Sequence, residues 1–551
     1  MNDALAQLAD DYWQAILDHD PTWRHMLGDY SDVGSFEDAT RAGSLAHAAR
    51  LRDFAAQADS LDPAGMDPQE QLTRGVIASS AVASADLAET PIGGLAADPV
   101  HGLQGTLPLL MGLLAVPDQD VADQMPAKLT AVGTHFRQLG DRIRESVPEG
   151  WVAAEFAVAD TIAQVEKALA VPPADDPVLA AVAPGAGVDA DRLRAALEEA
   201  IEQAVRPGLE AYRDALRDVA LPRARAEDRC GLSWLPGGEE AYDATLRYFT
   251  TTGRSAQEIH EIGLAQVAKL ADEYRALGPE VVGTDDLQEI FEAMRSDPKL
   301  HFEDADELVE QSRVALARAE SVMGEWFAVV PKAPCAVEGT LVGAKAFYFP
   351  PAGDGSRGGT FFVNITDPET WGRFELEAMA FHEGVPGHHL QLAIAAELPD
   401  SMPDFRKHLH NSAYAEGWGL YTERLSDEMG LYSSAVDRMG MYSADSMRAC
   451  RLVVDTGLHA LGWSRQQAID YMVANSPLTE GVCRPEIDRY ICNPGQATSY
   501  MIGRLEIQRM RREAEQRQGA RFDIKAFHSA VLESGSMPLD VLDRLVATEL
   551  P

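Results

Sequence analysis

The segment AMAFHEGVPGHHLQLAIA, residues 378–395, carries the pattern on which the interpretation of this chain depends. His382 followed by Glu383 matches the start of the H-E-x-x-H motif, in which two histidines one helical turn apart bind zinc and the glutamate acts as a base. The position four residues after His382, where the second histidine belongs, is Pro386. The segment therefore raises the question of whether an interrupted helix can present two histidines to one metal.

An undistorted helix cannot bring His382 together with a histidine beyond the proline. A residue six positions later points about 120° away, and a residue seven positions later lies about 10 Å further along the axis. Pro386 cannot donate a hydrogen bond to position 382 and its ring crowds that carbonyl, while Gly387 tolerates unusual dihedral angles. We therefore predict a kink or bulge that lets His388 act as the second ligand.

A catalytic zinc site usually has three protein ligands and one open position, so a third group is needed. The helical segment NSAYAEGWGLYTERL, residues 411–425, contains Glu416 between small residues that allow close approach, and Glu423 seven positions later on the same face. Glu416 is the first candidate and Glu423 the second. Histidines near a glutamate are also common at the surface, or beside a metal ligand without binding the metal. The pattern alone therefore leaves open whether these residues bind a metal.

Most of the chain has the three- and four-residue apolar spacing of amphipathic helices. Clear examples are residues 1–18, 124–147, 190–221 and 255–277. The sequence predicts a mainly α fold with a helical N-terminal half, residues 1–240, packed against a catalytic half, residues 241–551, as one continuous unit.

One region departs from the helical pattern. Aromatic and β-branched runs at 346–349 and 360–365 flank a glycine-rich segment, which predicts a β-hairpin just before the histidine motif.

The composition excludes several classes of function. A formal net charge of −40 repels nucleic acid and anionic membrane surfaces. The N-terminus lacks the features of a signal peptide and no long apolar run is present, so we expect a cytoplasmic protein without membrane or nucleic-acid partners. The five cysteines are scattered, which favours reduced structural thiols over disulfides or a thiolate zinc site.

A polar stripe runs along the segment SMRACRLVVDTGLHALGW, residues 446–463, where Arg448, Arg451, Asp455 and His459 share one helical face. Such a row can bind a carboxylate and orient a histidine. A structural network of ion pairs between helices is the alternative. We take His459 as a candidate for stabilising a transition state.

A second polar row follows in CNPGQATSYMIGRLEIQ, residues 492–508. Tyr500 could donate a hydrogen bond to an oxyanion, and Arg504 lies four residues later on the same face. Simple packing of the tyrosine between helices is the alternative.

These motifs together resemble the bacterial DUF885 family, which is grouped with zinc metallopeptidases of the gluzincin type. The resemblance covers LPGGEEAYDATLRYFTTTGRSAQEIHEIGLAQV, GTFFVN, HEGVPGHHLQ, AYAEGWGLYTERL, RLVVDTGLHALGWSRQQAIDYM and NPGQATSYMIG, and spans most of residues 230–510. It implies a helical fold with a deep cleft, like the helical carboxypeptidases and dipeptidases.

By this analogy His382, His388 and Glu416 would bind one zinc ion per chain, and Glu383 would be the general base. The analogy also implies that a strand edge, residues 362–364, holds the substrate backbone, with Asn364 as a side-chain contact.

The activity expected from the resemblance is zinc-dependent hydrolysis of a peptide or a small peptide-like amide. His459 and Tyr500 would stabilise the oxyanion, and capture of a terminal carboxylate by Arg448, Arg451 or Arg504 would make the protein an exopeptidase. The alternatives are a catalytically inactive metal- or peptide-binding protein and a metal-dependent enzyme for a specialised amide. The oligomeric state is left open, with a homodimer as one candidate.

Overall fold

The computed structural model describes residues 2–351 and 357–551, and it confirms the predicted mainly helical fold. Four segments predicted as helices are helical, although 190–221 contains two π-helical turns, Ile201–Val205 and Leu216–Ala220. Among the described residues, no helix combines the length and apolar character needed to cross a membrane.

The α-helices in the first part of the chain are α1 Asp3–His19, α2 Pro21–Met26, α3 Arg41–Ser60, α4 Pro68–Glu89, α5 Leu103–Leu113, α6 Gln119–Ser146, α7 Glu155–Ala170, α8 Pro177–Ala181, α9 Ala190–Ala200, α10 Arg206–Ala215, α11 Gly238–Thr250, α12 Ala256–Val281, α13 Leu287–Ser296 and α14 Ala305–Trp326. After the three strands β1 Cys335–Thr340, β2 Ala346–Phe349 and β3 Gly359–Asn364 come α15 Glu375–Glu383, α16 His388–Ala396, α17 Asp404–His408, α18 Ser412–Glu428, α19 Ala435–His459, α20 Arg465–Asn475, α21 Glu480–Cys492, α22 Ser499–Gln518, α23 Ile524–Leu532 and α24 Leu539–Glu549.

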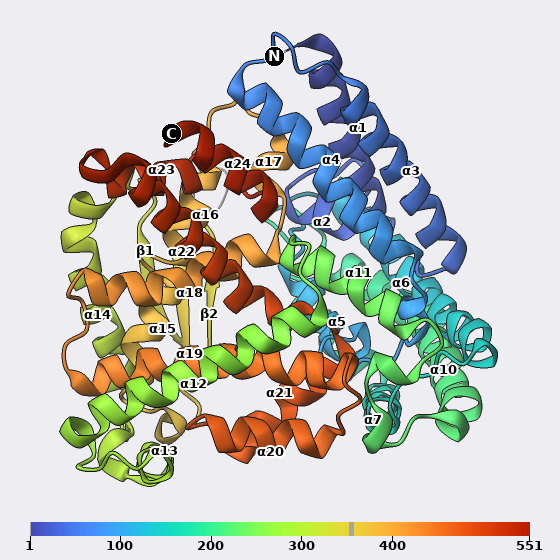
Figure 1. The fold of residues 1–551 in the computed structure, drawn as a ribbon. Helices are drawn as coiled ribbons and strands as arrows, with labels where there is room; N and C mark the ends of the chain where they lie inside the picture. Colours follow the sequence, from blue (N-terminus) through green and yellow to red (C-terminus); the bar gives the residue numbers. More distant parts are fainter. Residues whose placement is uncertain (1, 352–356) are drawn as a thin grey trace.

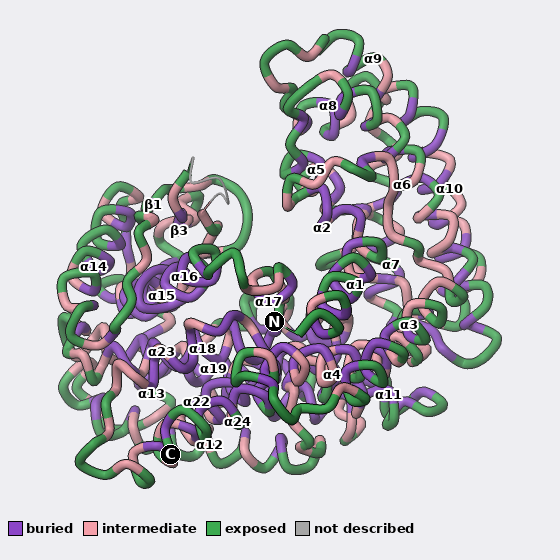
Figure 2. The backbone as a smooth tube through the Cα atoms, turned by 90° about the horizontal axis from the view of Figure 1, so that it is seen from above, coloured by how far each residue is buried: buried purple, intermediate pink, exposed green. Residues whose placement is uncertain are grey.

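The helices form two arms on a common base (Figure 2). One arm contains α5, α6, α8, α9 and α10, and the other contains α14, α15, α16 and the strands. Helices α18, α19 and α22 run through the base (Figures 1 and 2).

The buried apolar core combines helices from both ends of the chain. One apolar cluster joins α1, α3 and α4 to α14, α15, α18, α22, α23 and α24, and Figure 1 shows the blue helix α4 beside the red helix α24. A second cluster is built only from residues between Val33 and Ala220. The first helices therefore share a core with the C-terminal part of the chain, and the boundary expected near residue 240 stays a prediction.

The predicted hairpin is present, but it belongs to a larger sheet. Strand β2 pairs antiparallel with β3, and the connection between them lies partly outside the described residues. Strand β1, which the sequence analysis did not predict, pairs with β3 in parallel, so the order is β1-β3-β2. The expectation that residues 362–364 offer a free strand edge is therefore wrong, because β3 is the central strand.

Candidate metal centre

A break between α15 and α16 brings the first two predicted ligands together. Helix α15 ends at Glu383, α16 begins at His388, and the four intervening residues include a cis Val385–Pro386 peptide bond. The rings of His382 and His388 lie 4.8 Å apart between centroids and are nearly perpendicular, at 89°. In place of the expected kink or bulge, the structure has a complete break between two helices. The break places the rings of His382 and His388 closer together than a continuous helix would allow.

Small residues and one tryptophan hold this interruption against its surroundings. A Cβ atom at Gly387 would lie 1.9 Å from the carbonyl oxygen of His382, and one at Gly384 would lie 2.2 Å from a methyl group of Leu316. The indole nitrogen of Trp418 donates a hydrogen bond to the Pro386 carbonyl over 3.0 Å. The turn therefore folds back onto α15 at a separation that only glycine allows.

Glu416 on α18 completes the group. One of its carboxylate oxygens lies 3.6 Å from Nε2 of His382 and 3.6 Å from Nε2 of His388. One ligand atom from each of the three residues falls within 4.8 Å of the others. Gly419 permits this approach, because a Cβ atom there would lie 2.7 Å from the His382 ring.

The donor set fits zinc. Two imidazole nitrogens and one carboxylate oxygen are a ligand combination found in catalytic zinc sites, where a fourth position stays open. The three side chains come from three different helices, α15, α16 and α18, and their ligand atoms face a common point. Of the sequence-predicted ligands, the structure brings His382, His388 and Glu416 together.

The electrostatics of the group favour a bound cation. Burial acts to lower the pKa of His382, but the carboxylates of Glu416 and Glu423, which accept from its ring nitrogens, outweigh burial and raise this pKa to about 9. Burial likewise acts to raise the pKa of Glu416, yet His382 and His388 hold it well below its ordinary value. The carboxylates thus stabilise positive charge at the position where a metal would bind.

Glu423, the second-choice ligand, has a different place. Its Oε1 atom lies 2.8 Å from Nδ1 of His382, on the side of the ring away from Glu416. A carboxylate in this position fixes the tautomer and orientation of a metal-binding histidine. Glu423 is therefore an orienting partner of His382.

Glu383, the predicted base, adjoins His382 on the last turn of α15 and is partly exposed. Its side chain forms no hydrogen bond or ion pair with any other described residue. Its carboxylate is therefore available to a substrate or a water molecule.

His459 is not placed at this centre. Its Nδ1 atom accepts a hydrogen bond from the Leu232 amide over 3.2 Å, and Nε2 donates to the Tyr490 carbonyl over 3.0 Å. Burial lowers the pKa of His459 to about 3, so the ring is neutral. It also lies eleven residues beyond Arg448, about 16 Å along α19. Both nitrogens are used by the fold, which corrects the expectation that His459 stabilises an oxyanion.

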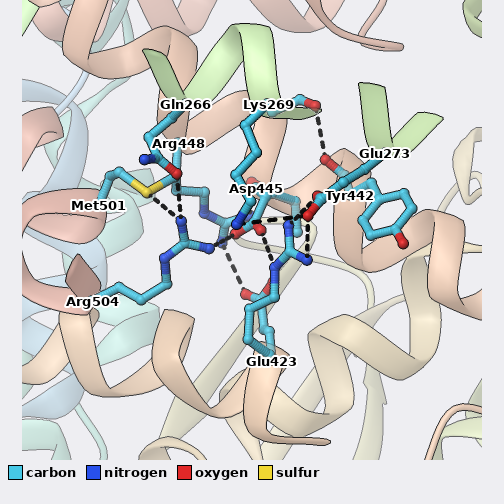
Figure 3. A network of polar contacts seen from close by, with 12 residues as sticks. Gln266, Lys269, Glu273, Glu423, Tyr442, Asp445, Arg448, Met501 and Arg504 are labelled. Atoms are coloured by element: carbon cyan, nitrogen blue, oxygen red, sulfur yellow. Dashed lines mark hydrogen bonds and ion pairs between the residues drawn. The ribbon is translucent and has the colours of Figure 1, made fainter. Parts of the chain in front are cut away.

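Arg504 is also committed elsewhere. It binds Asp445, which is fully buried between Arg504 and Arg424, while Arg424 also pairs with Glu273. Figure 3 shows this network, in which Gln266 and Met501 also contact Arg504. The expected role of Arg504 in binding a substrate carboxylate is therefore corrected, because Asp445 already occupies its guanidinium group.

Arg448, Arg451 and Tyr500 lie together near the metal ligands. One Arg448 nitrogen is 3.9 Å from Oε1 of Glu423, the contact drawn in Figure 3. The Arg451 guanidinium carbon lies 4.4 Å from the centre of the Tyr500 ring. Burial and the nearby Glu416 charge raise the pKa of Tyr500, so its hydroxyl keeps its proton.

Asn364 is a structural residue at the end of β3. Its side-chain nitrogen donates to the Gly343 carbonyl over 3.1 Å, and its side-chain oxygen accepts from the Thr366 amide over 3.0 Å. These bonds stabilise the turns around the sheet. The expected substrate contact by Asn364 is corrected for this reason.

The sequence analysis missed His410, which is exposed in the segment before α18. Although the residue is exposed as a whole, desolvation of its ring lowers the pKa of His410, and the nearby charges of Glu416 and His388 also act on that pKa. It forms no hydrogen bond with another described residue. No motif marks it, because it neighbours the ligands in space and only its position six residues before Glu416 could have pointed to it.

Comparison with known proteins places the chain in a family. The model of a family described as "Bacterial protein of unknown function (DUF885)" matches residues 21–546. The chain belongs to the DUF885 family. This confirms the family resemblance inferred from the motifs, and no curated protein matches the chain.

Two solved structures share the fold of this DUF885 protein. A "putative lipoprotein" from Colwellia psychrerythraea is 24% identical, with a TM-score of 0.90 and 99% of each chain covered. A "putative lipoprotein of unknown function" from Shewanella oneidensis is 20% identical, with a TM-score of 0.78, and the match covers 98% of this chain and 99% of that one. At these identities the likeness concerns the fold alone.

Proposed function

We propose that this DUF885 protein hydrolyses a peptide or peptide-like amide bond with the help of a bound zinc ion. The observation that carries the proposal is the convergence of His382, His388 and Glu416 beside Glu383, a carboxylate without a partner among the described residues. A site that only binds metal has no need of a free base next to a ligand. This combination favours catalysis over metal or peptide binding alone.

His382, His388 and Glu416 would hold the ion, which when bound polarises the amide carbonyl and lowers the pKa of water. Glu423 keeps the His382 proton on Nδ1, so that Nε2 has a free lone pair. The Glu383 carboxylate accepts one proton from the attacking water and passes it to the amine nitrogen as the carbon–nitrogen bond breaks.

Two side chains are suited to stabilise negative charge on the carbonyl oxygen. The Tyr500 hydroxyl remains protonated and can donate a hydrogen bond. His410 is the second candidate, because it lies close enough to Glu416 and His388 to sense their charges. These two residues take the role that the sequence analysis gave to His459 and Tyr500.

The test compares metal content and turnover in matched variants. The wild-type protein should contain about one zinc per chain and cleave members of a peptide mixture. His388→Ala should lose the metal, whereas His389→Gln should keep it, because His389 bonds to Tyr348 and the Ala333 carbonyl instead. Glu383→Gln should keep the metal and lose turnover by about 100-fold or more.

Two results would contradict the proposal. A wild-type protein that binds no zinc even when it is supplied would remove the metal centre. Full activity in Glu383→Gln would remove the general base. Metal without turnover on any peptide would favour the alternatives, a binding protein or an enzyme for a specialised amide.

A further inference from the structure

Three buried or half-buried arginines surround Tyr500 and form what we term the arginine cluster: Arg448, Arg451 and Arg489. Arg451 and Arg489 share one carboxylate, Glu486, each at 3.0 Å. Among the described residues, Arg448 has one carboxylate contact, 3.9 Å from Glu423, which is already bound to His382, and it donates a hydrogen bond to the Ala444 carbonyl of its own helix. Within the described part of the chain, the three cations therefore have one closely paired carboxylate, Glu486.

The neighbouring ionic network shows how unusual this imbalance is. In the network of Figure 3, the two arginines Arg424 and Arg504 are paired with two carboxylates, Asp445 and Glu273, and the exposed Lys269 also contacts Glu273 at 3.7 Å. Buried charges are normally paired in this way, because an unpaired ion in the interior is costly. The excess positive charge of the arginine cluster, in a protein of net charge −40, therefore indicates a missing anion.

Individual atoms lead to the same conclusion. Arg451 is 5% exposed and Arg448 is 8% exposed, yet one terminal nitrogen of Arg451 and Nε of Arg448 have no hydrogen-bond partner. Buried donors are nearly always satisfied, and each unsatisfied one requires an explanation. Glu486 does not bond to these two atoms, and its Oε2 atom accepts hydrogen bonds from other atoms of Arg451, Arg489 and Tyr490.

The arginine cluster adjoins the metal centre through the crossing of α18 and α22. A Cβ atom at Gly417 would lie 2.6 Å from the Cα atom of Gly503, so the two backbones touch. The hydroxyls of Ser412 and Ser499 lie 2.7 Å apart at the starts of the same helices. Glu416 precedes Gly417, and Tyr500 follows Ser499, so the ligand and the tyrosine occupy the same crossing.

We infer that the arginine cluster binds the free C-terminal carboxylate of a peptide, so that the proposed hydrolase is an exopeptidase. The term hydrolase rests on the proposed function. The arginine cluster can bind a carboxylate even if the protein has no turnover. Guanidinium groups recognise carboxylates through paired, charge-assisted hydrogen bonds. Arg489 is a new member of this site, and Arg504 is excluded from it.

The test is a binding experiment on zinc-loaded Glu383→Gln protein, which should not turn over its ligands. The probes are Ala-Ala-Ala, Ala-Ala-Phe and Ala-Ala-Lys, each as the free acid and as the C-terminal amide, titrated by calorimetry. At least one acid should bind about tenfold or more tightly than its amide, because the amide lacks the charge that the arginines pair with. Equal binding of acid and amide, or no binding by any acid, would overturn the inference.

Variants assign the effect to the cluster. Arg448→Met and Arg489→Met should each reduce the acid-to-amide preference by about fivefold or more. Arg438→Met is the matched control on the same helix, because Arg438 is paired with Asp427 and lies ten residues before Arg448. The control should keep the full preference, and zinc content and thermal unfolding are measured for every variant. A loss in the control equal to that in Arg448→Met would contradict the assignment.

The source of the carboxylate is tested with Ala-Ala-Asp amide, which offers a side-chain carboxylate and no free C-terminus. It should bind as weakly as the other amides. If it binds as tightly as the acids, the exopeptidase inference fails. An acid preference in a protein that never cleaves peptides would support the carboxylate site while the proposed hydrolysis fails.

Discussion

The two nitrogens of His382 have separate tasks. Nε2 faces Glu416 and His388, and Nδ1 is held by Glu423 over 2.8 Å. Glu423 is almost fully buried, and an Arg448 nitrogen lies 3.9 Å from the same oxygen that holds His382. The zinc affinity of the metal centre should therefore depend on Glu423, which does not itself bind the metal.

We expect Glu423→Gln to weaken zinc binding by about 10- to 100-fold, since loss of an outer carboxylate lowers the basicity and order of the ligand it holds. A competition titration against a fluorescent chelator measures the affinity directly. Glu428→Gln is the control on the same helix, because Glu428 pairs with Arg511 at the far end of α18. An unchanged affinity in Glu423→Gln would show that Glu423 has no part in ordering His382.

Helix α19 carries four polar residues on one face, and these residues have different roles. Arg448 and Arg451 approach the metal side, whereas Asp455 and His459 are fully buried among α11, α21 and the segments beside them. Asp455 accepts a hydrogen bond from the Tyr242 hydroxyl and one from the Gly495 amide. The stripe is thus part binding surface and part structural network.

The buried Asp455 makes stability depend on pH. Burial raises its pKa from 3.8 to about 7, so the folded protein keeps a proton that the unfolded chain releases near pH 4. The contribution of Asp455 to the free energy of unfolding therefore falls as the pH rises from about 4 to about 7 and levels off above it. Asp455→Asn should remove this loss, which amounts to about 4 kcal/mol at most.

Urea unfolding of the wild type and Asp455→Asn at about pH 4, 5.5 and 8 tests the sign of this effect. The stability of the variant relative to the wild type should increase with pH. A difference that is constant over this range, or that decreases, would show that Asp455 does not hold its proton in the folded state.

Local patterns predicted much of the fold and of the site. Helical spacing, the hairpin at 346–349 and 360–365, and the interruption at Pro386–Gly387 depend on residues close together in sequence. Strand β1 was missed because its six residues include a glycine and a glutamate and its pairing with β3 spans a long connection. The errors at His459 and Arg504 have one cause: their partners Leu232, Tyr490 and Asp445 are distant in sequence.

For the whole molecule, the first helices are part of the core that supports the metal centre. Tyr12 on α1 is almost fully buried and makes edge-to-face contacts with Phe54 on α3 and Phe405 on α17, at 5.6 and 5.4 Å between ring centres. Helix α17 directly precedes α18, which carries Glu416. The second apolar cluster, confined to residues between Val33 and Ala220, includes none of these three aromatic residues.

Tyr12→Ala should therefore destabilise one part of the molecule far more than the other. Removal of the ring creates a cavity and costs about 3–5 kcal/mol. Hydrogen exchange followed by mass spectrometry should show lost protection in α1, α3, α4, α17, α18 and α24, while α6 and α10 keep theirs. Leu109→Ala is the control, because Leu109 is exposed on α5. If α6 and α10 lose protection equally, the two clusters unfold as one unit; if only α1 and α3 respond, the first helices do not support the metal centre.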